Sequence, residues 1–117
     1  MKKSITILED DRDIREICTM LFMDEGYGVD SFENIKSFNK RPTRPSLFLL
    51  DVQLPDGNGL DLCEKLKTDK NFASIPIIMM SAHLHRAETM KRSLADDFIE
   101  KPFDIERLLQ RVAVLIG

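Results

Sequence analysis

The chain has 117 residues, a length that suits one compact domain, and we expect a single domain over residues 1–117. Hydrophobic residues make up 43% and charged residues 32%, which excludes a disordered chain and a membrane-embedded one. The net charge of −3 offers no general attraction to nucleic acid, so no direct nucleic-acid partner is expected. No apolar run approaches the roughly 20 residues of a membrane helix, so no membrane partner is expected either.

The first residues and the two cysteines indicate a cytoplasmic protein. Lys2 and Lys3 are followed by a short apolar stretch that soon reaches Glu9, which leaves no room for the apolar core of a signal peptide. Cys18 and Cys63 have neither the Cys-x-x-Cys nor the metal-finger spacing. We therefore expect reduced, buried thiols and a location in the cytoplasm.

The chain begins with a strand pattern followed by a helix pattern. Ser4–Leu8 is a predicted strand, and a predicted helix over 13–25 ends at Gly26. A second strand is predicted over Gly28–Phe32. The apolar face expected for the helix consists of Ile14, Ile17, Cys18, Leu21 and Phe22.

The middle of the chain contains the most strongly apolar stretch. A weak helical segment over 34–40 and a proline-containing loop over 41–45 precede it. Residues 47–50 are uniformly apolar, as expected of a strand covered on both faces of a parallel sheet, and this strand ends at Asp51. A turn-rich loop over 55–59 follows, and we expect its Asp and Gly residues to shape the loop.

The second half continues the alternation of strands and helices. Helices are predicted over 60–67 and 86–94, and strands over 75–80 and 98–99. Asp104 can cap a last helix, whose expected apolar face consists of Ile105, Leu108, Leu109, Val112 and Leu115. Five strands alternating with five helices predict an α/β fold, a doubly wound five-stranded parallel sheet in the flavodoxin-like order 2-1-3-4-5 with helices on both faces.

Chemically active residues fall at the carboxyl ends of the predicted strands. Glu9 and Asp10 follow the first strand, Asp51 ends the third, and Ser81 and Lys101 follow the fourth and fifth. Because these strand ends meet at one edge of a parallel sheet, the residues should converge there. Three carboxylates brought together repel one another, which predicts a bound divalent cation, and Mg²⁺ suits oxygen ligands beside a phosphate.

This arrangement predicts phosphoryl transfer. The Asp51 carboxylate would be the nucleophile and would form an aspartyl phosphate that water later hydrolyses. Mg²⁺, Lys101 and the Ser81 hydroxyl would then neutralise or bind the oxygens of the transferred group.

Four segments resemble the signature blocks of receiver domains of two-component response regulators, the CheY-like superfamily. They are ILEDD at 7–11, LLDVQLPDG at 49–57, MSA at 80–82 and EKPF at 100–103. Each block alone is weak evidence, but the four occur in the family's order and the similarity runs essentially from end to end. The chain is therefore identified as a member of this family.

The resemblance implies a role for each matching residue. Glu9 and Asp10 match the acidic pair that binds Mg²⁺, and Asp51 matches the phosphoacceptor. Gln53 holds the position whose backbone carbonyl ligates the metal, and Lys101 matches the lysine that pairs with the phosphate.

The resemblance also implies a switch and a set of partners. Ser81 corresponds to the hydroxyl switch and Phe98 to the switch aromatic, and the Lys101–Pro102 peptide bond is expected to be cis. The phosphoryl donor would be a sensor histidine kinase or a histidine phosphotransfer protein, and the output would go to a downstream effector protein or domain. Such a protein catalyses only its own phosphorylation and slow dephosphorylation. Whether it forms a homodimer stays open.

Three features depart from the family pattern. Glu9 stands where aspartate is commoner, and Ser81 replaces the commoner threonine while keeping the hydroxyl. The stretch from Ser81 to Lys101 is shorter than usual and lacks the small Gly-Ala element before residues 96–98. This shortening affects the usual output face rather than the phosphorylation site.

Three other functions are alternatives to phosphoacceptance. An interaction module of the same fold that ignores phosphate stays open because of the shortened segment. A phosphohydrolase would need a second carboxylate two residues after Asp51, where this chain has Gln53. A flavin phosphate would be repelled by Glu9 and Asp10 at the first strand end.

Overall fold

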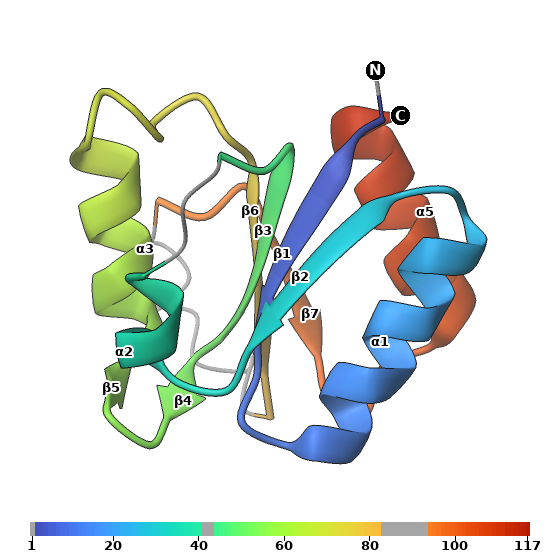
Figure 1. Ribbon diagram of the computed structural model, residues 1–117, viewed down its shortest axis with the longest axis horizontal. Coiled ribbons are helices and arrows are strands. Elements are labelled where there is room, and N and C mark those ends of the chain that lie inside the picture. Colours follow the sequence, from blue (N-terminus) through green and yellow to red (C-terminus); the bar gives the residue numbers. More distant parts are fainter. Residues whose placement is uncertain (1, 41–43, 83–93) are drawn as a thin grey trace.

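A five-stranded parallel sheet forms the centre of the computed structural model, which describes residues 2–40, 44–82 and 94–117 (Figure 1). The strands lie in the order β2-β1-β3-β6-β7, which confirms the predicted order 2-1-3-4-5. Every neighbouring pair in this sheet is parallel. The strands are β1 Ser4–Leu8, β2 Gly28–Phe32, β3 Leu47–Asp51, β6 Ile77–Ser81 and β7 Asp97–Glu100.

Helices cover both faces of the sheet (Figure 1). Helices α1 (Arg12–Asp24) and α5 (Ile105–Ile116) lie on one face, and α2 (Ile35–Phe38) and α3 (Gly59–Thr68) lie on the other. Because successive side chains of a strand point to opposite faces, each central strand supplies both layers of the core. This explains why β3 is buried along its whole length and needs a continuous apolar sequence.

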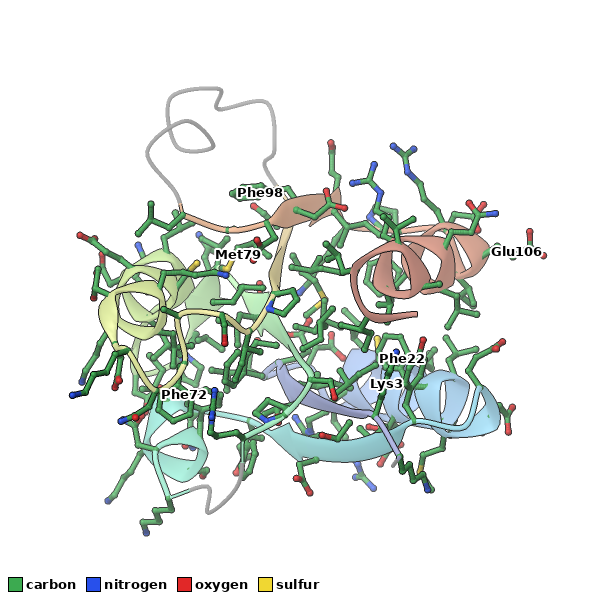
Figure 2. All side chains as sticks on the ribbon, turned by 90° about the horizontal axis from the view of Figure 1, so that it is seen from above. Lys3, Phe22, Phe72, Met79, Phe98 and Glu106 are labelled. Atoms are coloured by element: carbon green, nitrogen blue, oxygen red, sulfur yellow. The ribbon has the colours of Figure 1, made fainter. Side chains whose placement is uncertain are left out.

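The core therefore has two halves separated by the sheet (Figure 2). Phe22 lies in the half under α1 and α5, whereas Met79 lies in the half under α3. Phe72 is partly buried and packs against this second half. The two cysteines divide in the same way, Cys18 in the first half and Cys63 in the second. Both thiols are buried and neither forms a disulfide, which confirms the prediction of reduced, buried thiols.

Several predicted boundaries and faces differ from the structure. The helix predicted over 13–25 is α1, one residue earlier at each end, because Asp11 caps it by accepting hydrogen bonds from the first turn. Ile17 and Ile105 belong to the predicted apolar faces but are 49% and 42% exposed. Helical periodicity places them at the margin of those faces, where the neighbouring elements do not cover them.

The segment after β3 contains structure that the sequence pattern did not show. Residues 55–59 were predicted to be a loop, but β4 (Gln53–Leu54) and β5 (Gly57–Asn58) pair as a small antiparallel hairpin. The helix predicted over 86–94 falls almost entirely on residues 83–93, which lie outside the described residues. Within the parts of the chain that are described, no helix combines the length and apolar character needed to cross a membrane.

Asp56 joins this hairpin to α2. Its Oδ1 accepts a hydrogen bond from Ile35 N at 2.8 Å and its Oδ2 accepts one from Lys36 N at 3.0 Å. These are the first two residues of α2, so the carboxylate supplies acceptors for N–H groups that a helix start leaves unpaired. The hydrogen bond from Ile35, with that from Lys36, holds the pKa of Asp56 below its ordinary value of 3.8.

Gly59 is where the hairpin returns to the sheet, directly against the end of β3. A methyl group at Gly59 would lie 1.9 Å from the carbonyl oxygen of Asp51, and Gly59 N donates to Val52 O at 2.7 Å. Only glycine allows this approach, because the atoms in the way are backbone atoms that no side-chain rotation can move. The position of Asp51 therefore depends on the absence of a side chain eight residues later.

The lowered pKa of Asp56 predicts a pH-dependent contribution to stability. Because the folded state holds this proton less tightly than the unfolded state, the contribution is complete above pH 3.8 and is lost as the pH falls through the folded pKa. We expect Asp56→Asn to unfold at lower urea concentration than wild type at pH 7, with the difference shrinking in acid. Asp30→Asn, at an exposed position of β2, is the matched control. If both variants lower the urea midpoint equally, the hydrogen bonds of Asp56 to α2 do not contribute the predicted stability.

The close approach of Gly59 predicts different effects for two alanine substitutions in one segment. Gly59→Ala should lower the free energy of unfolding by about 1–3 kcal/mol, because the methyl group meets the Asp51 backbone. Gly57→Ala is the control: its methyl group would meet only the end of the Ile35 side chain, so we expect a change within about 0.5 kcal/mol. Urea denaturation measures both. A Gly59→Ala protein as stable as wild type would refute the tight packing.

Candidate functional site

The predicted acidic residues meet at the carboxyl edge of the sheet. Glu9 follows β1 directly and Asp51 is the last residue of β3, the neighbouring strand. One carboxylate oxygen from each of Glu9, Asp10 and Asp51 lies within 4.8 Å of the other two. The structure thus brings together the three carboxylates that the sequence predicted would converge.

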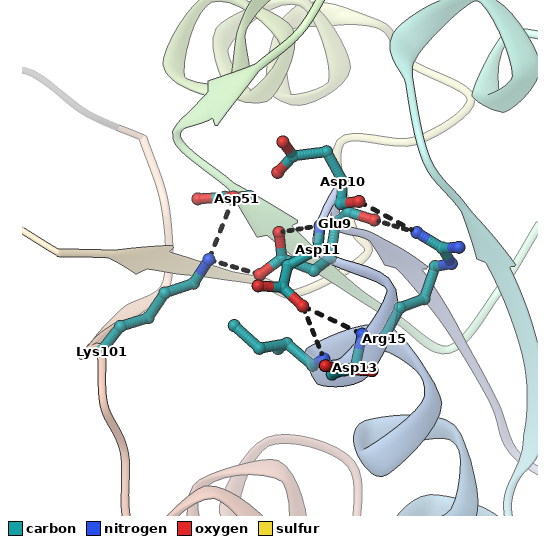
Figure 3. Close-up of polar contacts among 8 residues, drawn as sticks. Glu9, Asp10, Asp11, Asp13, Arg15, Asp51 and Lys101 are labelled. Carbon is teal, nitrogen blue, oxygen red and sulfur yellow. Dashed lines mark hydrogen bonds and ion pairs between the residues drawn. The ribbon is translucent and has the colours of Figure 1, made fainter.

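Lys101 lies between two of these carboxylates (Figure 3). Its Nζ donates hydrogen bonds to Asp51 Oδ2 at 3.0 Å and to Glu9 Oε1. The Glu9 side chain is fully buried and that of Asp51 is 9% exposed, so water screens these ion pairs poorly. The Lys101–Pro102 peptide bond is cis, as predicted.

The charges of the site are unbalanced. Burial, and then the hydrogen bond shared with Asp51, raises the pKa of Glu9. Burial and the adjacent Glu9 carboxylate raise the pKa of Asp10 as well. Burial alone would lower the pKa of Lys101, but its hydrogen bonds to Glu9 and Asp51 outweigh burial and raise it. One ammonium therefore faces three carboxylates, and the excess negative charge favours a cation.

The turn between β1 and α1 is fixed by contacts that the sequence analysis missed (Figure 3). Arg15 of α1 donates from Nη1 to the carbonyl oxygens of Glu9 at 2.8 Å and Asp10 at 3.4 Å. Asp11 Oδ1 accepts from Asp13 N at 2.9 Å and so caps α1. No spacing in the sequence distinguishes Arg15 from the charged residues around it.

The remaining predicted residues surround this cluster. Ser81 is half-buried at the end of β6, and its backbone carbonyl accepts from Lys101 N at 2.9 Å. Gln53 is exposed on β4, two residues after Asp51. Phe98 is half-buried on β7 and lines a groove of about 760 Å³ that runs along β7 and the start of α5. Arg111 borders this groove and donates to Phe98 O at 2.9 Å.

The donor set fits a hard divalent cation. Mg²⁺ binds oxygen ligands and usually takes a few carboxylates together with water. Glu9, Asp10 and Asp51 offer such oxygens. Glu9 and Asp51 are buried, whereas Asp10 is exposed, so the site is open to solvent at Asp10. Burial, together with the neighbouring carboxylates, raises the pKa values of Glu9 and Asp10, and a cation here would favour their ionised forms.

Curated proteins with similar sequences include bacterial regulatory proteins. Transcriptional regulatory protein GltR of Pseudomonas aeruginosa is 33% identical over 97% of this chain and 49% of its own length. The DNA-binding response regulator MtrA of Mycobacterium tuberculosis is 33% identical over 96% of this chain and 50% of its own. The chain thus spans about half the length of the curated relatives it matches.

A solved structure shows the same likeness in three dimensions. Response regulator TrrA of Thermotoga maritima, in complex with Mg²⁺ and BeF, has a TM-score of 0.84 and 27% identity, over 97% of this chain and 98% of its own. The family model described as the response regulator receiver domain matches residues 5–113. With nearly the whole chain matched, the protein belongs to the response regulator receiver domain family.

Proposed function

We propose that this protein is a phosphoacceptor that takes a phosphoryl group onto Asp51 in the presence of Mg²⁺. The observation that carries the proposal is the arrangement around Asp51: its carboxylate lies 3.0 Å from the Lys101 ammonium and beside the carboxylates of Glu9 and Asp10. The donor would be a sensor histidine kinase or a histidine phosphotransfer protein. Residues 1–117 would act as one receiver unit in the cytoplasm.

The proposed metal ligands are Glu9, Asp10, Asp51 and the backbone carbonyl of Gln53. Bound Mg²⁺ would neutralise negative charge on the oxygens of the phosphoryl group as it is transferred. Glu9 enters this site with both oxygens engaged, Oε1 with Lys101 and Oε2 with Asp11 N at 3.2 Å. Because each carboxylate oxygen has a second lone pair, Glu9 could ligate the metal while it keeps these contacts.

The chemistry at Asp51 is a simple displacement. A carboxylate oxygen attacks phosphorus, the bond from phosphorus to the donor nitrogen breaks, and the histidine leaves with the electron pair of that bond. The product is an acyl phosphate on Asp51. Lys101 then pairs with a phosphoryl oxygen instead of the bare carboxylate. Slow attack by water on phosphorus breaks the bond to the Asp51 oxygen, releases inorganic phosphate and restores the aspartate.

The output depends on the groove beside β7. A phosphoryl group on Asp51 would attract the Ser81 hydroxyl, and the movement of Ser81 would free space for Phe98 to turn inward from the groove. Since Phe98 and Arg111 both border this groove, its shape would change for a downstream effector protein or domain. The alternative of a module that ignores phosphate is less well supported, because Lys101 pairs with Glu9 and Asp51 beside Asp10 in an arrangement suited to phosphate.

Phosphorylation of the purified protein tests the proposal. We expect incubation with acetyl phosphate and Mg²⁺ to add the mass of one phosphoryl group, and the adduct to decay with time. Asp51→Asn should show no adduct, and chelation of Mg²⁺ should prevent it in wild type. Intact-mass spectrometry measures each. If wild type forms no adduct and binds no beryllofluoride, the site does not function and a phosphate-independent interaction module becomes the better account.

A further inference from the structure

We propose that Arg15 is a positioning residue that holds the backbone of Glu9 and Asp10 so that their carboxylates face the metal. The inference rests on the metal binding proposed above and extends it to a residue outside the carboxylate cluster. Arg15 lies in the second turn of α1 and is half-buried. In Figure 3 its guanidinium is on the opposite side of the β1–α1 turn from Lys101.

The β1–α1 turn needs such a support. The pairing of β1 with β3 ends at Leu8, so the carbonyl groups of Glu9 and Asp10 lie beyond that ladder. Glu9 is buried, so its backbone carbonyl needs a hydrogen-bond partner, and Arg15 Nη1 supplies it at 2.8 Å. The same nitrogen reaches the carbonyl of the exposed Asp10 at 3.4 Å. Fixing these peptide groups fixes the direction in which each carboxylate leaves the chain.

Arg15 holds the turn without binding the carboxylate oxygens that would ligate the metal. Both of its contacts with the turn are to backbone oxygens, and among the ion pairs found for residues 2–40, 44–82 and 94–117 none involves Arg15. Lys101, by contrast, pairs with the carboxylates of Glu9 and Asp51 directly and takes up part of their capacity to accept. The arginine therefore contributes rigidity at a position where it leaves the carboxylate oxygens available.

Two physical effects of removing Arg15 have opposite signs. Loss of a positive charge near an acidic site should strengthen the binding of a cation. Loss of a contact that orients metal ligands should weaken it, by about tenfold or more for groups that support ligands in this way. The sign of the change therefore distinguishes a positioning role from a purely electrostatic one.

Arg12 provides the matched control for charge. It lies three residues earlier on the same helix, is 79% exposed and pairs with Glu16 at 3.0 Å. Arg12→Ala removes the same charge from the same end of α1 but leaves the turn untouched. Arg15→Lys is a second variant, because it keeps the charge but cannot reproduce the planar donor geometry of arginine.

The experiment is a titration with Mn²⁺ as a stand-in for Mg²⁺, with free Mn²⁺ followed by electron paramagnetic resonance and Mg²⁺ added as competitor. We expect Arg15→Ala to bind about tenfold more weakly than wild type. Arg12→Ala should bind as wild type or slightly more tightly, and Arg15→Lys should lie between wild type and Arg15→Ala. Urea denaturation without metal checks that each variant is folded.

The outcomes separate this inference from the proposed function. If wild type binds Mn²⁺ and Arg15→Ala binds as tightly as Arg12→Ala, Arg15 acts through charge alone and the inference is overturned, while the metal site stands. If Arg15→Ala does not fold, Arg15→Lys decides: weaker binding at unchanged stability supports the inference, and unchanged binding overturns it. If wild type itself binds no Mn²⁺, both the metal site and this inference fall.

Discussion

Repulsion among the carboxylates of Glu9, Asp10 and Asp51 is the constraint on which the functional edge of this molecule depends. Their oxygens lie within 4.8 Å of one another, and one of the three side chains is fully buried. Such a cluster persists because Lys101 reaches two of its members. The balance is incomplete, as the raised pKa values of Glu9 and Asp10 show, and this imbalance is what makes the edge receptive to a cation.

The fold tolerates this charge by placing it where the apolar core ends. Strand β3 is apolar while it is covered on both faces and becomes polar at its carboxyl end, at Asp51. Residues outside the carboxylate cluster hold the backbone at these strand ends. Arg15 donates to backbone carbonyls of the β1–α1 turn, and Gly59 packs against the carbonyl of Asp51. Stability of the core and geometry of the site are thus linked through the backbone.

Much of the fold and the centre of the site could be predicted from the sequence. Uniform apolar runs, helix caps and the alternation of elements were enough for a doubly wound parallel sheet, and Asp51 was conspicuous as a carboxylate ending an apolar strand. The predictions failed where a residue's partner is distant in the chain. Ile17 and Ile105 fit a helical stripe yet are exposed, and the hairpin formed by residues 53–58 gave no alternating signal because each of its strands has only two residues.

The sequence by itself determined which segments form the strands and which residues stand at the strand ends, because hydrophobic periodicity and local capping act over a few neighbouring positions. Tertiary structure alone decided which groups hold those residues in place. Lys101 reaches Glu9 across 92 positions and Asp56 reaches Ile35 across 21, contacts that no local pattern encodes. The charge on Glu9 depends on such contacts, since burial and the approach of Asp51 exist only once the strands lie side by side.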